Sequence, residues 1–304
     1  MNKYNKNCAK GCPLQGKEIG NGYFCLMEKM DIKRVVALYF SPTHTTRKTV
    51  EAIAAGAVSK IGTDTYTRIN ITTPVQRKVT PTFGKGDLVI FGVPVYIGRV
   101  PNLMRDFIAS IKGDGAIGVP VAVYGNRAFD DALIELRDIM QGNGFRCVAA
   151  GAFIGEHSFS YILGEGRPDA ADLQTAKAFG EEIAAKILAG EELALEVKVP
   201  GNPYPYKFYN AKSSSNSSID IRKVKPETDP EKCTSCGLCA MLCPMGAIDP
   251  ANCALVPGIC IKCGACIKMC RPKAKYFSDP TYLEHKEILE KNFTHPRKEP
   301  EIFW

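Results

Sequence analysis

Two runs of cysteine residues carry the most specific chemical signal in this sequence. The run from Cys233 to Cys243 has the spacing C-x2-C-x2-C-x3-C, and the run from Cys260 to Cys270 repeats it. Three closely spaced thiolates can hold one face of an iron–sulfur cubane, while a distant fourth thiolate completes the site. The repeat therefore predicts two [4Fe–4S] clusters, with these metal ligands: Cys233, Cys236, Cys239, Cys243, Cys260, Cys263, Cys266 and Cys270.

Zinc is the alternative metal, because C-x2-C pairs also form tetrahedral all-thiolate sites. A zinc ion needs only four ligands and gives no reason for a doubled run, so we favour iron–sulfur chemistry. Cys253 lies outside both runs and is expected to be a spare small residue, although a role as an alternative ligand stays open. Cys8, Cys12 and Cys25 have no fourth partner nearby and predict at most a weak metal site.

Composition and charge narrow the class of protein. The 13 cysteines are odd in number and the N-terminus has no apolar signal segment, which favours a reducing, cytoplasmic location over a disulfide scaffold. No apolar stretch approaches the roughly 18 residues of a membrane span, so we expect no membrane insertion. The hydrophobic content of 45% is that of a globular protein.

The formal net charge of +7 raises the question of nucleic-acid binding. Each oxidised cluster with its four thiolates would contribute a charge of about −2. We therefore interpret the basic residues of the cysteine-rich segment as compensation for cluster charge and expect no nucleic-acid site. Removal of Lys262 or Lys268 should then lower a cluster potential. The residues concerned are Lys232, Lys262, Lys268, Arg271, Lys273 and Lys275.

Residues 31–190 alternate between strand-like and helix-like segments. Helical periodicity or an initial proline predicts the longest helices at 47–61 and 168–189. Five strands with intervening helices imply an α/β fold with a doubly wound, five-stranded parallel sheet. The short apolar runs that predict these strands cover residues 34–40, 66–71, 87–91, 119–124 and 145–154.

The loop after the first strand, from Ser41 to Thr46, combines hydroxyl groups with free backbone N–H groups at a helix N-terminus. This combination favours an anion. The loop has no Walker lysine, which disfavours ATP and GTP and leaves a phosphate monoester such as that of FMN. A G-x-G-x-x-G match at residues 113–118 precedes a strand instead of following one, so we reject a dinucleotide site there.

Together with this loop, the pattern of residues 32–190 resembles flavodoxin. The family's phosphate loop reads roughly S/T-x-T-G-x-T, and Ser41, Thr43 and Thr46 match it, while His44 replaces the usual glycine. His44 could donate to the phosphate, or it could be a solvent-exposed loop histidine. The resemblance implies FMN at the carboxyl ends of the first and third strands. The phosphate-binding residues would be Ser41, Thr43, His44, Thr45 and Thr46.

The resemblance also points to two further loops at the same edge of the sheet. Tyr96 would stack on the isoalloxazine ring, Asn126 would bind its edge, and Arg127 would lie near N1–C2=O. The simpler interpretations are a core aromatic for Tyr96 and surface charge for Arg127. His157, in the loop after the fifth strand, is expected to be structural. The ring-binding candidates are Pro94, Val95, Tyr96, Ile97, Gly98, Gly125, Asn126 and Arg127.

The cysteine-rich segment resembles the bacterial two-[4Fe–4S] ferredoxins, in which the fourth cysteine of each run binds the other cluster. The resemblance implies a small α+β two-cluster ferredoxin-like domain that its metal holds folded. One cluster would bind Cys233, Cys236, Cys239 and Cys270. The other would bind Cys243, Cys260, Cys263 and Cys266.

These expectations divide the chain into five parts. An N-terminal extension (1–30) precedes a flavodoxin-like FMN-binding domain (31–195), a linker (196–219), a two-cluster ferredoxin domain (220–278), and a C-terminal helix and tail (279–304). Four aromatic side chains of the linker are expected to pack on a domain surface: Tyr204, Tyr206, Phe208 and Tyr209.

The whole chain resembles an anaerobe-type fusion of a flavodoxin-like domain with a ferredoxin, which implies a cytoplasmic electron carrier. It would relay electrons between two [4Fe–4S] clusters and FMN, and exchange them with redox partner proteins such as ferredoxin-dependent oxidoreductases. Nothing resembles a nucleophile–base pair, so no catalytic residue is assigned. One alternative is a flavin-dependent reductase of a quinone or nitro compound, fed by its own ferredoxin domain. Another is an iron–sulfur redox sensor. The oligomeric state stays open.

Overall fold

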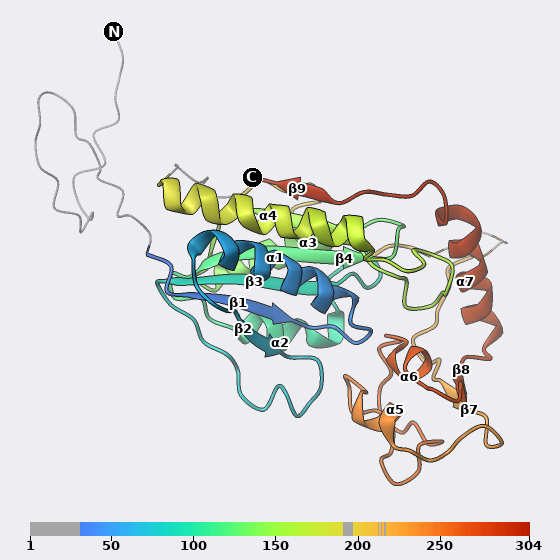
Figure 1. The fold of residues 1–304 in the computed structure, drawn as a ribbon. Helices are drawn as coiled ribbons and strands as arrows, with labels where there is room; N and C mark the ends of the chain where they lie inside the picture. The colour runs from blue at the N-terminus through green and yellow to red at the C-terminus, as the bar shows by residue number, and fades with distance from the viewer. Residues whose placement is uncertain (1–30, 191–196, 212, 214, 216) are drawn as a thin grey trace, which may run out of the picture.

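The computed structural model describes residues 31–190, 197–211, 213, 215 and 217–304 (Figure 1). The expected N-terminal extension, with Cys8, Cys12 and Cys25, lies outside the described residues. No helix within the described ranges is both long and apolar enough to cross a lipid bilayer.

A parallel sheet forms the centre of the larger part of the chain. Its strands are paired in the order β2-β1-β3-β4-β6, and the short β5 also pairs with β4. This order, with the first strand between the second and third, is that of flavodoxin-like doubly wound sheets. The predicted fold class is therefore confirmed. The strands are β1 (Arg34–Tyr39), β2 (Thr67–Asn70), β3 (Asp87–Pro94), β4 (Ile117–Tyr124), β5 (Arg146–Cys147) and β6 (Ala150–Ile154).

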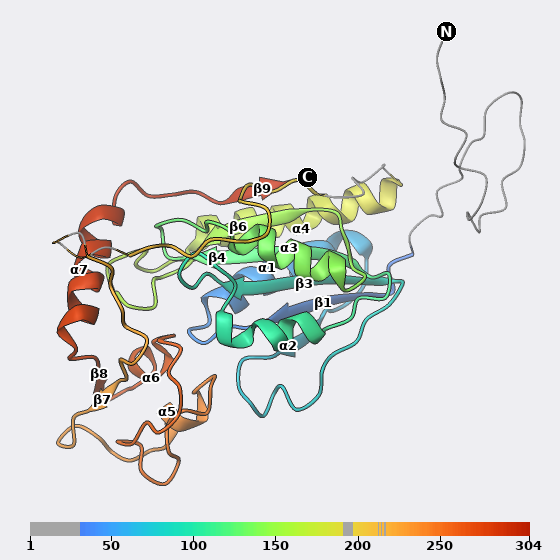
Figure 2. The same cartoon turned by 180° about the vertical axis from the view of Figure 1, so that it is seen from behind.

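Helices cover both faces of this sheet (Figures 1 and 2). Side chains alternate along each strand, so Val36 and Leu38 enter one core while Val35 and Ala37 enter the other. Burial on both faces explains why the strands read as continuous apolar runs. One face packs on α1 (Thr45–Ile61) and α4 (Ala170–Ala189), and the other on η1 (Asn102–Met104), α2 (Arg105–Ser110) and α3 (Ala132–Gly142).

Two glycines allow α1 and α4 to approach closely. A Cβ atom built on Gly56 would lie 2.0 Å from the carbonyl oxygen of Lys177. A Cβ atom built on Gly180 would lie 1.9 Å from the carbonyl oxygen of Ile53. These helices therefore pack backbone to backbone, and neither glycine position can accept a methyl group without movement of the helices.

The cysteine-rich segment has little regular structure. Two short helices, α5 (Leu238–Met241) and α6 (Ala265–Lys268), occupy the same position in each cysteine run. Strands β7 (Glu227–Thr228) and β8 (Lys275–Tyr276) pair antiparallel and close the segment. The segment lies beyond the ends of the parallel strands, below α7 in Figure 1.

The tail returns the chain to the sheet. Asp279 caps α7 (Pro280–Phe293) by accepting a hydrogen bond from the Tyr282 N–H, and Pro280 fills the first helical position. The sequence did not predict β9 (Glu301–Phe303), which pairs antiparallel with β6. Three residues are too few to show strand alternation, and β9 forms because the edge of β6 offers unpaired backbone groups.

Replacement of Gly180 by alanine tests the close packing of the two helices. We expect Gly180→Ala to lower the free energy of unfolding by about 1–3 kcal/mol, the usual cost of overpacking. Gly142→Ala is the control, because no atom lies within 4 Å of the added methyl group. It should change stability by less than about 1 kcal/mol. Denaturant unfolding of the metal-loaded chain measures both variants, and equal effects would contradict the packing described.

Candidate functional site

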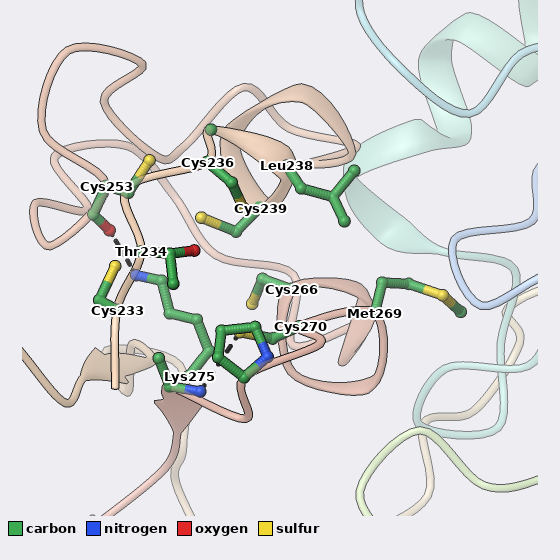
Figure 3. Close-up of a pocket in the computed structure, with 13 residues that line it drawn as sticks. Cys233, Thr234, Cys236, Leu238, Cys239, Cys253, Cys266, Met269, Cys270 and Lys275 are labelled. Carbon is green, nitrogen blue, oxygen red and sulfur yellow. Dashed lines mark hydrogen bonds between the residues drawn. The ribbon is translucent and has the colours of Figure 1, made fainter. Parts of the chain in front are cut away.

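The structure gathers the eight cysteines of the two runs around two cavities. The first is open to solvent, and its empty space, open solvent included, is about 400 Å³. Cys253, which was expected to be a spare small residue, is buried and also lines this cavity, as does Cys266. Cys236 is exposed to solvent. Figure 3 shows the side chains around this space, and we define the outer cysteine group as Cys233, Cys236, Cys239 and Cys270.

The second cavity is also open to solvent, and its empty space, open solvent included, is about 370 Å³. In each group, the last cysteine of one run lies with the first three of the other run. This membership is the one that the ferredoxin resemblance implies, and ligation of a cluster by each group stays a prediction. The second cavity is lined by the inner cysteine group, which we define as Cys243, Cys260, Cys263 and Cys266.

The backbone of the two runs uses the same local geometry twice. Gly237 (φ 73°) and Gly264 (φ 71°) adopt left-handed conformations immediately before α5 and α6. At the end of the runs, the Ala247 N–H donates to Cys243 Sγ at 3.2 Å, and the Ala274 N–H donates to Cys270 Sγ at 3.3 Å. Backbone N–H groups that point at sulfur stabilise the charge of a thiolate or a cluster.

Thiols dominate the donor atoms around both cavities. Within the ranges that the structure describes, no three or more His, Cys, Asp or Glu side chains are arranged to hold a metal ion. Burial raises the pKa of Cys266 to about 12. Burial and the neighbouring Cys253 raise the pKa of Cys239 to about 11. Because metal binds the thiolate, loading of these groups must release protons.

The predicted phosphate loop has one unsatisfied group. The Arg47 N–H donates to Ser41 Oγ at 2.9 Å, and the Ser41 N–H donates to Thr72 Oγ1 at 2.8 Å. Thr46 is 1% exposed, and its Oγ1 has no hydrogen-bond partner among the described residues. A buried hydroxyl without a partner at the first turn of α1 fits a bound anion.

His44 takes the backbone role of the family's glycine. It is the N-cap of α1 with φ 69°, in the left-handed region that histidine adopts more readily than most residues. Burial lowers the pKa of His44, and the charges of Arg47 and Lys48 lower it further. These effects favour the neutral imidazole, which could donate a hydrogen bond to a phosphate.

The loop after β3 turns sharply beside the inner cysteine group. Tyr96 and Arg99 exchange two backbone hydrogen bonds of 2.9 and 3.1 Å across Ile97 and Gly98, which both have positive φ, as in a type I′ turn. Burial raises the pKa of Tyr96, and the thiolate charges of Cys263 and Cys260 add to the effect. Tyr96 therefore lies within electrostatic range of the inner group. Its stacking on a flavin stays a prediction.

The Asn126 side chain, in the loop after β4, has other partners than the flavin ring that the sequence predicts for it. The Asn126 side-chain amide donates to the carbonyls of Phe293 (2.6 Å) and Pro296 (3.1 Å), and its Oδ1 accepts from the Lys298 N–H (3.0 Å). The Asn126 side chain therefore binds the tail. A hydrogen bond from this loop to the edge of the isoalloxazine ring would have to come from the backbone instead. The sequence could not show it, because the partners lie some 170 residues away.

Arg127 and His157 also have structural partners. The Arg127 guanidinium pairs with Asp130 and lies 3.8 Å from the centre of the Tyr209 ring. His157 Nδ1 accepts from the Phe159 N–H, and burial, followed by the charge of Lys268, lowers its pKa to about 3. His157 is therefore neutral, which fits the structural role expected for it.

Three of the four linker aromatics pack as expected. Tyr206 and Phe208 lie against the guanidinium of Arg99, at 5.0 and 4.7 Å from the ring centres, and Tyr209 lies against Arg127. Tyr204 remains 75% exposed. The linker is thereby attached to the loops at the carboxyl edge of the sheet.

Lys268 of α6 anchors the cysteine-rich segment to the loop after β6. Its Nζ pairs with the Glu156 carboxylate and donates to the carbonyls of His157 (2.6 Å) and Ser160 (2.7 Å). A Cβ atom on Gly264 would lie 2.4 Å from the Ser158 carbonyl oxygen, so the two backbones are in contact. No local motif of the sequence marks Glu156 or Ser160 for this role.

Arg77 makes a second contact between the two parts. Its guanidinium donates to the Thr72 carbonyl at 2.5 Å and to the Pro244 carbonyl at 2.7 Å. Thr72 also accepts the hydrogen bond from Ser41, and Pro244 follows Cys243 in the chain. A short chain of hydrogen bonds therefore connects the predicted phosphate loop with the inner cysteine group.

Removal of the unpaired hydroxyl tests the phosphate loop. We expect Thr46→Val to weaken binding of FMN by about ten- to a hundredfold, the usual value of a hydrogen bond to a charged group. Thr49→Val is the control, because the Thr49 hydroxyl already donates to the Thr45 carbonyl within the helix. Titration of flavin-free protein with FMN measures both, and equal affinities for Thr46→Val and the unaltered chain would contradict the assignment.

Known proteins resemble each part of the chain. Residues 226–249 match the family model of the 4Fe-4S binding domain. The pyruvate synthase subunit PorD of Methanothermobacter marburgensis is 32% identical over 84 residues, which cover 28% of this chain and 90% of PorD.

Solved flavodoxin structures resemble the other part. A flavodoxin from the domain Archaea is 20% identical and covers 51% of this chain and 98% of its own length, with a TM-score of 0.36. A flavodoxin of Streptococcus pneumonia TIGR4 is 19% identical and covers 50% and 97%, with a TM-score of 0.35. The fold assignment itself comes from the strand order. The chain therefore belongs to the 4Fe-4S ferredoxin family that includes PorD, and carries a flavodoxin-like α/β domain fused on the N-terminal side of its ferredoxin segment.

Proposed function

We propose that this chain relays electrons between two [4Fe–4S] clusters and FMN, and exchanges them with redox partner proteins. A 4Fe-4S ferredoxin segment joined to a flavodoxin-like fold supports an electron-transfer role. The observation that carries the finer proposal is the position of the inner cysteine group. It lies against the sheet edge that bears the predicted flavin loops, since Arg77 binds the carbonyl of Pro244 beside Cys243 and Gly264 contacts the backbone of Ser158.

The chain would hold its cofactors with residues already described. The outer and inner cysteine groups would bind one cluster each, and the loop from Ser41 to Thr46 would bind the phosphate of FMN. When bound, the clusters supply one-electron centres and FMN supplies a centre for one or two electrons. The protein's own contribution is to fix these sites relative to one another.

The contacts of Lys268 and Arg77 provide this fixed geometry. Lys268 ties α6 to the loop after β6, while Arg77 ties Pro244 to the loop after β2. Pro244 directly follows Cys243, and Lys268 lies two residues after Cys266, so each contact is close in the chain to a cysteine of the inner group. The tail adds a third connection, because α7 leads from the cysteine-rich segment back to β9 on the sheet.

The two cysteine groups differ in their access to partners. Cys236 of the outer group is exposed, whereas Cys263 of the inner group is 7% exposed and lies near Tyr96. We infer that partner proteins exchange electrons at the outer group. PorD is named as a subunit of pyruvate synthase. By analogy, the partner of this chain would be an oxidoreductase that uses a ferredoxin.

The cofactor content of the anaerobically purified chain tests this proposal. We expect about eight iron and eight sulfide per chain, as two cubane clusters require, together with one FMN. Metal analysis, sulfide determination and flavin fluorescence after denaturation measure the three contents. Stoichiometric zinc in place of iron, or no flavin after reconstitution, would contradict the proposal. Turnover of a quinone or nitro compound in the same preparation would favour a reductase instead.

A pair of lysine variants tests the contact between the two parts. Lys268→Met removes the hydrogen bonds to residues 156–160, so hydrogen exchange there should increase and reduction of FMN through the ferredoxin segment should slow by about tenfold or more. Lys262→Met is the control, because it removes the same charge near the cysteines. The Lys262 Nζ donates to the carbonyls of Arg222 and Cys260 and not to residues 156–160.

Stopped-flow absorbance and hydrogen–deuterium exchange distinguish the two lysine variants at equal cofactor content. Identical behaviour of Lys268→Met and Lys262→Met would show that the charge alone matters and that the contact does not.

A further inference from the structure

Lys275 places a buried ammonium group at the outer cysteine group. The residue belongs to β8, is 3% exposed and lines the outer cavity. Figure 3 shows its side chain extending among the cysteines to the Cys253 carbonyl, to which its Nζ donates a hydrogen bond. The carbonyl is neutral, so this hydrogen bond leaves the positive charge of the lysine uncompensated.

The other lysines of the segment are balanced or more exposed. Lys268 pairs with Glu156, and Lys232 pairs with Asp229 at 2.6 Å at the surface. Lys275 has no carboxylate partner among the residues that the structure describes. An ammonium group that is buried without a counter-ion is strongly destabilising. Its charge acts on Cys239 and Cys266, which would be thiolates when they bind metal.

Comparison of the two cysteine runs shows that the position of Lys275 is occupied by a different type of residue after the other run. Lys275 stands five residues after Cys270, and Ile248 stands five residues after Cys243. Both follow an alanine whose N–H donates to the last cysteine sulfur of the run. Ile248 is 4% exposed and lines the inner cavity, as Lys275 lines the outer one. One cavity therefore has an aliphatic side chain where the other has a cation.

We propose that Lys275 sets the reduction potential of the outer cluster above that of the inner cluster. This inference rests on the proposed function, because it requires a cluster in each cysteine group. Reduction adds one electron and changes the charge of a cluster with four thiolates from about −2 to about −3, with no bond made or broken. The electron comes from the redox partner. A fixed positive charge stabilises the more negative, reduced state, which raises the potential.

Neighbouring cysteines respond to the same charge. Burial raises the pKa values of Cys239 and Cys266, whereas the Lys275 ammonium acts in the opposite direction on both. Cys266 belongs to the inner group but also lines the outer cavity. Lys275 should therefore influence the inner cluster as well, but less strongly than the outer cluster, whose cavity it lines.

A potentiometric titration of the full-length, anaerobically purified chain, monitored by EPR, tests the proposal. We expect two separate cluster couples in the unaltered chain. In Lys275→Met and Lys275→Gln, the higher couple should shift to more negative potential, so that the two couples move closer together. Lys275→Arg keeps the charge and should keep both couples in place. Lys232→Met is the control for loss of an exposed, paired lysine and should shift neither couple measurably.

Iron and sulfide analysis of every variant separates the possible failures. Fewer than eight iron per unaltered chain would mean that the proposed function fails. Full iron content with unchanged couples in Lys275→Met would overturn the role of Lys275 alone. Loss of half the iron in both Lys275→Met and Lys275→Gln, with retention in Lys275→Arg, would make Lys275 a structural residue and would also overturn the proposal.

Discussion

The contact between α6 and the loop after β6 determines how the rest of this molecule can work. Parallel strands present all their carboxyl ends at one edge of the sheet, and that edge carries the predicted flavin loops. Lys268 fastens the cysteine-rich segment there through the Glu156 carboxylate and two backbone carbonyls. The linker and α7 alone would keep the cysteine-rich segment near the sheet. They would not fix the distance between the cysteine groups and the predicted flavin site.

The cysteine-rich segment depends on this attachment because it has little hydrophobic core of its own. Most of the large buried side chains belong to the two layers that enclose the parallel sheet. In the segment, the buried residues surround the cysteines, and the cavities between them occupy the place of a core. Bound metal would therefore contribute to folding as well as to electron transfer. The linker aromatics, Arg77 and β9 hold the segment from the side of the sheet.

The parts of the structure that local patterns encode could be predicted. The cysteine spacing predicts two groups of four, and the apolar runs predict five parallel strands. The structure gathers the cysteines around two cavities, and it forms the parallel sheet with the last predicted strand divided into β5 and β6. His44 was identified as an exception to the family's loop, and its left-handed backbone explains how the exception is accommodated. These features depend on residues close together in the sequence, where periodicity and spacing are informative.

The missed features all involve partners distant in the sequence. The Asn126 side chain holds residues 293–298, Arg77 reaches Pro244, and β9 pairs with β6. No local pattern marks these contacts, since each depends on how the finished sheet presents its edge. Lys275 is different, because comparison of the two cysteine runs places it opposite Ile248. That comparison was available from the sequence, but only burial distinguishes this lysine from its surface neighbours.

The central claim is that the inner cysteine group adjoins the flavin site, and the distance between flavin and cluster tests it most directly. Pulsed EPR on the anaerobic, fully loaded chain can measure magnetic coupling between the flavin signal and the reduced clusters. The account predicts coupling that persists in Cys236→Ser, which disrupts the outer group, and weakens strongly in Cys263→Ser, which disrupts the inner group. Coupling that is lost only in Cys236→Ser, or is absent from the unaltered chain, would contradict it.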